Sequence, residues 1–138
     1  MNILVTGSKG YIGTVLMKEL EDNNFKVKGL DSGYFSDCLV KEIQEEYDYI
    51  NKDIRDITLE DLNDVDSIIH LAALSNDPLG EFNYELTQII NFKSTINLAK
   101  LAKQKGISRF VYVSSQSMYG ISDTNSELEE DNSKKLPI

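Results

Sequence analysis

The sequence predicts an α/β fold in which helices cover both faces of a doubly wound parallel sheet. Short apolar runs of strand length alternate along the chain with longer segments whose apolar residues recur at helical spacing. The first of these runs is followed directly by a glycine-punctuated turn and then by a helical segment, which is the order of a βα unit. Parallel strands joined in this way form such a sheet, with right-handed crossovers.

The chain begins with a strand, a helix and a second strand. Residues 3–5 are a short apolar run that predicts a strand, and residues 26–30 predict a second strand that ends at Asp31. Between them the apolar residues at helical spacing are Ile12, Val15, Leu16 and Leu20. Residues 36–46 are polar and ambiguous, with room for a further helix.

The middle of the chain contains two short predicted elements and one buried strand. Residues 49–50 predict a short third strand that runs into Asp53. Residues 58–62 have a hydroxyl start and an acidic first turn, which favours a short helix. Residues 67–71 are a continuous apolar run, typical of a strand covered on both faces.

The remaining elements are a long helix, a strand and an acidic tail. Residues 81–105 carry apolar residues at helical intervals, Ile96 among them, and Gly106 supplies the helix stop. Residues 110–113 predict another buried strand. From residue 122 to residue 138 the chain is polar and acidic, and we expect a mobile surface segment.

Length and composition limit what the chain can be. Its 138 residues correspond to one domain, which we place at residues 1–121. The net charge of −9 argues against a nucleic-acid or anionic-membrane partner. Cys38 is alone, which excludes an internal disulfide and a multi-cysteine zinc site, and no metal is predicted. Without a visible signal peptide or membrane-spanning run, we expect a cytoplasmic protein.

The turn after the first strand contains three glycines at a spacing of three residues. Gly7 permits a tight turn, Gly10 lets backbone N–H groups approach a pyrophosphate, and Gly13 lets the helix pack closely on the strand. An ordinary glycine-rich turn is the alternative, which the flanking strand and helix disfavour.

With Thr6 in front, this G-x-x-G-x-x-G pattern resembles the short-chain dehydrogenase/reductase superfamily. Later residues narrow the resemblance to its extended branch, the NAD-dependent sugar-nucleotide epimerases and dehydratases. The resemblance implies a Rossmann-like domain that binds NAD, and it adds Tyr11 and Ile12 to the cofactor-binding residues. It also implies a nucleotide-sugar substrate and a homodimer formed partly through the helix of residues 81–105.

Asp31 ends the second strand, where a carboxylate can accept hydrogen bonds from both hydroxyls of an adenosine ribose. Its charge would repel a 2′-phosphate, so it favours NAD over NADP. Lys9, in the glycine turn, is a weaker signal in the opposite direction. The alternative for Asp31 is a solvated turn residue.

Three further positions resemble the cofactor-binding residues of the extended branch. The resemblance implies that Asp53 accepts a hydrogen bond from the adenine amine and that Ile54 contacts the ring. The chain has Lys52 where the family often has glycine. Asn91 resembles the helix asparagine that orders the active-site region.

The segment His70-Leu71-Ala72-Ala73 resembles the exit of the family's fourth strand. There, small residues let the cofactor pass close to the backbone, so Leu71, Ala72 and Ala73 are predicted cofactor-binding residues. His70 is the only histidine, and a histidine in a buried strand is more often a core residue than a catalyst.

Ser115 is the predicted catalytic residue. It follows a strand, where open α/β sheets place their ligands, and it precedes Tyr119-Gly120 by four residues. The resemblance implies that its hydroxyl binds the sugar hydroxyl that is oxidised; the alternative is a turn serine. Gln116 and Ser117 stand where sugar dehydratases of the family carry Asp-Glu, which counts against that reaction.

The superfamily's Tyr-x-x-x-Lys motif is missing, because none of the seven tyrosines has a lysine four residues later. We therefore expect a fold truncated before the last strands and the substrate domain. The expected function is the NAD-binding part of a UDP-glucose 4-epimerase-like enzyme, inactive as this chain. A stand-alone NAD-binding module and a reductase or decarboxylase of the same family are the alternatives.

Overall fold

The computed structural model describes residues 1–35, 47–75 and 83–115. Several predicted features therefore lie outside the described residues. They are the ambiguous segment 36–46 with Cys38, the first residues of the long helix, Gln116 and the residues after it, and the acidic segment 122–138.

The centre of the fold is one sheet of five parallel strands in the order β3-β2-β1-β4-β5. The strands are β1 (Asn2–Thr6), β2 (Lys26–Asp31), β3 (Asp48–Asn51), β4 (Ser67–His70) and β5 (Arg109–Tyr112). Thr6, the last residue of β1, is paired with Leu30 on one side and His70 on the other. The predicted doubly wound, Rossmann-like α/β fold is thereby confirmed.

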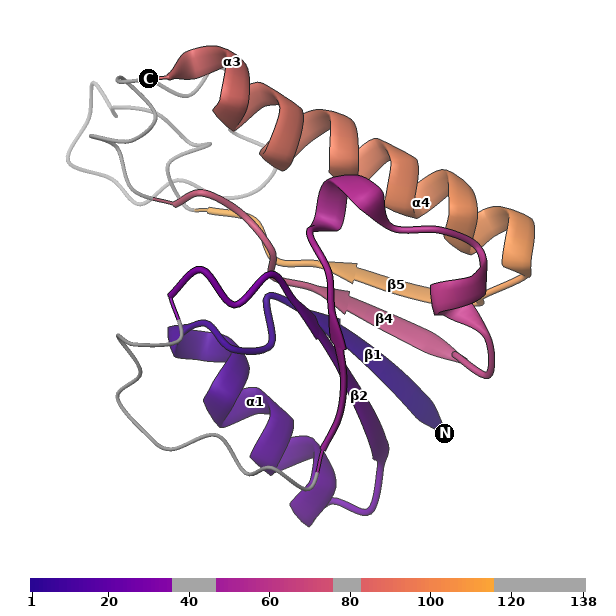
Figure 1. Cartoon of the computed structure of the whole chain (residues 1–138). Helices are drawn as coiled ribbons and strands as arrows, with labels where there is room; N and C mark the ends of the chain where they lie inside the picture. Colours follow the sequence, from indigo (N-terminus) through magenta and orange to yellow (C-terminus); the bar gives the residue numbers. More distant parts are fainter. Residues whose placement is uncertain (36–46, 76–82, 116–138) are drawn as a thin grey trace, which may run out of the picture.

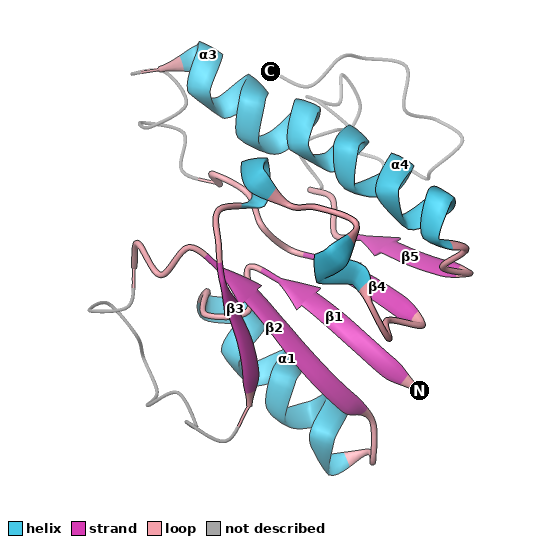
Figure 2. Cartoon of the chain, turned by 45° about the vertical axis from the view of Figure 1, so that its right-hand side comes forward, coloured by secondary structure: helices cyan, strands magenta, loops and turns pink. Residues whose placement is uncertain are grey.

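Helices cover both faces of the sheet, as Figures 1 and 2 show. Helix α1 (Tyr11–Asp22) lies on one face, and the long helix that ends with α4 (Ser94–Lys105) lies on the other. The side chains of β1 alternate between these layers. Ile3 and Val5 form a core cluster with Met17 of α1, whereas Leu4 belongs to the cluster that contains Leu98 of α4.

The buried faces of the helices match the apolar spacing only in part: Leu16 and Leu20 of α1 pack against the core as predicted, but other positions differ. In α1 the buried residues are Gly13 and Met17, whereas Ile12 and Val15 are exposed. In α4 the buried residues are Ser94, Leu98 and Ala102, and Ile96 is 42% exposed. In both helices a small or polar residue occupies the inward position, which a count of apolar residues does not detect.

The long helix is continuous in sequence but is not α-helical throughout. A short helix α3 (Tyr84–Thr87) is followed by a π-helical segment η4 (Gln88–Lys93), which passes directly into α4. The Ser94 hydroxyl donates to the carbonyl oxygen of Ile89 at 3.0 Å. Gly106 ends the helix with a φ of 77°, as predicted.

The segment after β3 is less helical than predicted. One 3₁₀ turn, η2 (Ile54–Asp56), follows β3, and a second, η3 (Glu60–Leu62), replaces the short helix expected over residues 58–62. The Thr58 amide and hydroxyl both donate to the carboxylate of Asp61, which also accepts two 2.7 Å bonds from Lys52. These bonds hold the Asp61 carboxylate close to Thr58 and Lys52, and the segment forms turns in place of a regular helix.

His70 joins three elements inside the fold. It is 1% exposed, and its ring lies between Thr6 of β1, at 2.6 Å from Nδ1, and Thr95 of α4, at 2.8 Å from Nε2. Burial lowers the pKa of His70 to about 4. The histidine is thus the buried core residue that its position in a strand predicted.

This burial predicts how stability depends on pH. Unfolded His70 has a pKa of about 6.5, so between that pH and about 4 the unfolded chain binds one more proton than the folded chain. The free energy of unfolding should therefore fall as the pH falls through this window, by about 1.4 kcal/mol per pH unit from His70 alone.

Urea unfolding of the parent and His70→Gln at several pH values in this window measures the effect. Carboxylates titrate in both proteins, so the difference between the two slopes isolates the histidine. Equal slopes would show that His70 titrates alike in the folded and unfolded states.

Candidate functional site

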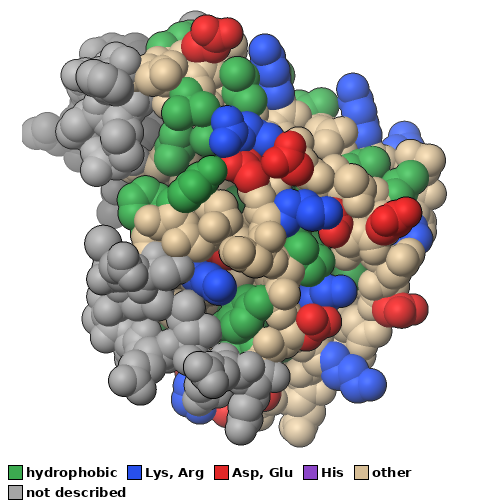
Figure 3. Space-filling model, viewed as in Figure 1, with side chains coloured by type: hydrophobic (Ala, Val, Ile, Leu, Met, Phe, Trp, Pro, Cys, Tyr) green, Lys and Arg blue, Asp and Glu red, His purple; other side chains and the backbone are tan. Residues whose placement is uncertain are grey.

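A cavity of about 550 Å³ lies at the carboxyl ends of the strands, where open parallel sheets place their ligands. Its wall includes eleven of the twelve predicted cofactor-binding residues, namely Gly7, Gly10, Tyr11, Ile12, Gly13, Asp31, Asp53, Ile54, Leu71, Ala72 and Ala73. In the space-filling view, hydrophobic side chains gather at the side where the strands end (Figure 3). Asn91 and Ser115 are not in the wall.

Gly7 and Gly13 are required by contacts within the protein. Gly7 has a φ of 70°, and a Cβ there would lie 2.8 Å from the backbone nitrogen of Ala72. A Cβ on Gly13 would lie 2.3 Å from the Gly7 carbonyl oxygen. Gly13 therefore packs the helix against the turn itself rather than against the strand, which corrects the prediction for this residue.

Gly10 differs from these two glycines. A Cβ on Gly10 would meet one neighbouring atom, the Gly7 carbonyl oxygen at 3.2 Å, so little of the protein competes for the space. Gly10 precedes the first turn of α1 and lines the cavity, and the helix start has no side-chain cap. The first backbone N–H groups of a helix attract anions, so this end of the cavity can receive a phosphate group.

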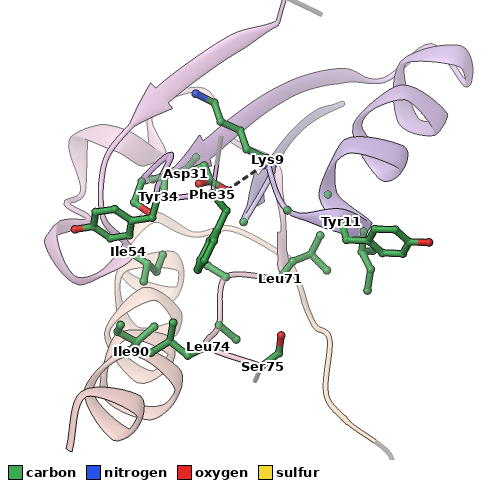
Figure 4. A pocket seen from close by; sticks show the side chains of 18 of the residues that line it. Lys9, Tyr11, Asp31, Tyr34, Phe35, Ile54, Leu71, Leu74, Ser75 and Ile90 are labelled. Atoms are coloured by element: carbon green, nitrogen blue, oxygen red, sulfur yellow. Dashed lines mark hydrogen bonds between the residues drawn. The ribbon is translucent and has the colours of Figure 1, made fainter. Parts of the chain in front are cut away.

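Asp31 is held in place by the turns on either side of it. Its carboxylate accepts a 2.9 Å bond from the Lys9 amide, drawn in Figure 4, and a 2.8 Å bond from the Gly33 amide. A carboxylate has about four acceptor positions, so each oxygen keeps capacity for one hydroxyl of a diol. The Lys9 ammonium lies 5.1 Å from the centre of the Tyr49 ring, where a cation–π contact holds it.

Asp53 already has strong partners. Arg55 donates to both of its oxygens, at 2.9 Å from Nε and 2.7 Å from the terminal nitrogen, and its amide adds a further 2.9 Å bond. The hydrogen bonds from Arg55 hold the pKa of Asp53 below its usual range, with a smaller effect from the Tyr34 hydroxyl. Any amine that binds this carboxylate must share it with Arg55. The neighbouring Ile54 is buried and lines the cavity.

Asn91 lies behind the cavity wall. Its side chain accepts a 2.8 Å bond from the Leu74 amide and donates a 2.8 Å bond to the Leu74 carbonyl oxygen. Leu74 itself lines the cavity. The amide of Asn91 thus fixes the backbone beside the site.

Ser115 follows β5 and is exposed, and its neighbour Ser114 lines the cavity. The predicted catalytic serine is therefore one residue away from the wall, at the carboxyl edge of the sheet.

Several apolar residues of the cavity were not predicted. Tyr34 and Phe35 follow Asp31 within four residues, and Leu74 follows the predicted Ala73 directly. Figure 4 shows Phe35 near Asp31 and Leu71, with Tyr11 on the opposite side of the cavity and Ile90 near Leu74. Tyr34, Phe35 and Leu74 could have been predicted from their positions close to Asp31 and Ala73 in the sequence. Ile90 could not, because it reaches the cavity from the π-helical segment.

Within the described ranges, no group of three metal-ligating side chains comes together, and no helix is long and apolar enough to cross a membrane.

Two known proteins are similar to most of this chain. The chain is 33% identical over 116 residues to a putative UDP-glucose 4-epimerase of Methanocaldococcus jannaschii, covering 82% of this chain and 37% of that protein. It is 32% identical over 124 residues to UDP-glucuronic acid decarboxylase 5 of Arabidopsis thaliana, covering 87% of this chain and 35% of the relative.

The fold matches the solved structure of MoeE5 in complex with UDP-glucose and NAD. The TM-score is 0.81 at 28% identity, and the match covers the whole of this chain and 42% of that one. The chain thus spans about two fifths of the length of the proteins it matches.

A family model decides the classification. The model of the NAD dependent epimerase/dehydratase family matches residues 3–137, nearly the whole chain. Its cofactor is the one predicted from the glycine turn and Asp31, so the predictions of NAD and of this family are confirmed. The chain belongs to the NAD dependent epimerase/dehydratase family.

Proposed function

We propose that this chain is the NAD-binding part of a nucleotide-sugar 4-epimerase. The observation that carries the proposal is that predicted residues from four separate strand ends line one cavity at the carboxyl edge of the sheet. A putative UDP-glucose 4-epimerase among the relatives supports the choice of reaction. The whole enzyme would act on a nucleotide-linked sugar. A homodimer through the long helix is part of the proposal, supported by the exposed Tyr84, Phe92 and Ile96.

Different residues of the cavity would bind different parts of NAD. Gly10 and the first turn of α1 would hold the pyrophosphate, and Asp31 would bind the adenosine ribose with its two remaining acceptor positions. Asp53 and Ile54 would bind the adenine, and Leu71 to Ala73 would leave room for the nicotinamide half.

When bound, NAD would accept a hydride from the sugar C4 carbon and later return it. The chain's own contribution near this carbon would be Ser115, whose hydroxyl would hydrogen-bond the sugar hydroxyl that loses its proton. This sequence lacks the Tyr-x-x-x-Lys motif that would supply a general base. We therefore propose that the chain binds NAD and is catalytically inactive alone.

A decarboxylase of the same family is the second candidate, since UDP-glucuronic acid decarboxylase 5 matches the chain about as well as the epimerase does. Among the described residues of the cavity wall, the cationic side chains are Lys9, which lies over the Tyr49 ring, and Lys52, which is paired with Asp61. We prefer the epimerase, because that reaction needs no cationic group for a sugar carboxylate.

Asp31→Ala should narrow the preference for NAD over NADP. Each lost charge-assisted hydrogen bond to the ribose contributes about 1.5–3 kcal/mol, so the NAD dissociation constant should rise by at least about tenfold. The affinity for NADP should fall less, because the carboxylate charge that repels its 2′-phosphate is also removed. Calorimetric titration with both cofactors measures the change, with Asp56→Ala as the control because Asp56 is not in the cavity wall. Equal affinity of the parent for both cofactors would contradict the role of Asp31.

The proposed inactivity is tested with UDP-glucose and UDP-galactose. An NMR assay of their interconversion, with NAD present, should show no turnover by this chain, because loss of a general base alone typically reduces a rate by about 10²–10⁴-fold. A full-length UDP-glucose 4-epimerase serves as the positive control. Turnover by this chain would refute the argument and require another base.

A further inference from the structure

One wall of the cavity is a stretch of backbone without regular secondary structure, residues 71–75. Two contacts from behind fix it. The Ala72 amide donates to the Thr6 hydroxyl at 3.3 Å, and the Leu74 amide and carbonyl are both bound by Asn91. On its other side, Gly7 approaches Ala72 so closely that a Cβ would not fit. Small displacements of this backbone therefore change the width of the cavity.

The two fixing contacts are linked to each other through His70. The Thr95 hydroxyl donates to the carbonyl oxygen of Asn91 at 2.7 Å. A hydroxyl has one hydrogen, so toward His70 Nε2, at 2.8 Å, the Thr95 oxygen must accept. Nε2 is then the protonated ring nitrogen of His70.

The other ring nitrogen completes the chain. With Nε2 protonated and the ring neutral, Nδ1 accepts from the Thr6 hydroxyl at 2.6 Å. The Thr6 oxygen then accepts from the Ala72 amide. Every hydrogen along this path has an acceptor, and no other tautomer achieves this with the bonds present. Thr6 and His70 are almost fully buried, so an unpaired group there would be costly.

Among the residues that the structure describes, no charged side chain contacts His70. Thr6 faces it from β1, Thr95 from α4, and the rings of Phe110 and Tyr112 from β5, at centroid distances of 6.1 and 5.9 Å. Among these groups only the Tyr112 phenol can ionise. Hydrogen bonding, rather than an ion pair, orients the imidazole.

We infer that Thr95 is a positioning residue for the cofactor cavity, acting through the Nε2–H tautomer of His70 and through Thr6 on the backbone at Ala72, and through Asn91 on Leu74. The effect on cofactor affinity rests on the proposed function. Thr95 itself is not part of the cavity wall. The long helix on one face of the sheet thus sets the shape of a site formed by the strand ends.

Thr95→Val tests this inference, because valine keeps the shape and removes the hydroxyl. Thr95→Ser restores the hydroxyl. Thr87→Val is the matched control, since the Thr87 hydroxyl also bonds the carbonyl four residues earlier, that of Asn83, whereas His70 is bonded by Thr6 and Thr95. Three readouts follow: the ring ¹⁵N shifts of His70, amide hydrogen exchange at Ala72 and Leu74, and the NAD dissociation constant.

In the parent, the ¹⁵N shifts should show a protonated Nε2 and an unprotonated Nδ1. Thr95→Val removes both hydrogen bonds of the Thr95 hydroxyl, so it should speed exchange at Ala72 and Leu74 relative to amides of β2 and β3 and should weaken NAD binding by about tenfold. Thr95→Ser and Thr87→Val should resemble the parent in all readouts.

A protonated Nδ1 in the parent, or unchanged exchange at Ala72 and Leu74 in Thr95→Val, would overturn the inference. The exchange readout does not need a cofactor. If the parent fails to bind NAD, the proposed function falls while the ring shifts and exchange rates still decide the role of Thr95.

Discussion

The close approach of two backbone segments, at Gly7 and Ala72, is the constraint on which the site depends. Gly7 leaves β1 with a positive φ, and its amide donates to the Leu30 carbonyl at 2.8 Å. There is no room for a side chain between it and the segment after β4. The turn is thereby fixed between β2 on one side and β4 on the other. Gly13 then seats α1 directly on this turn, which aims the start of the helix at the cavity.

Polar side chains in the cavity wall and behind it hold the wall in one conformation. Asp31 is fixed by the amides of Lys9 and Gly33, and Leu74 by Asn91. In each case a side chain binds backbone amides, so the groups that face the cavity are oriented before any ligand arrives. Such preorganisation lowers the entropic cost of binding. His70 links this layer to the helix that covers the opposite face of the sheet.

Most of the site could be predicted because its residues follow strand ends in the sequence. In a parallel sheet these ends meet at one edge, so Gly7, Asp31, Asp53 and Ala72 come together once the strands are identified. Asn91 was predicted to order the active-site region, but its place behind the wall was not, because the π-helical segment that carries it has no clear sequence signature. The buried face of α4 was also misplaced where Ser94 takes the buried position.

The central claim is that the glycine turn receives the cofactor, and Gly10→Val tests it most directly. A control, Thr14→Val, places valine four residues later, in the first turn of α1 but outside the cavity wall. Calorimetric titration with NAD should show binding by the parent and by Thr14→Val. It should show none by Gly10→Val, while thermal unfolding finds all three folded. Binding of NAD by a folded Gly10→Val with the parent's affinity would contradict the account.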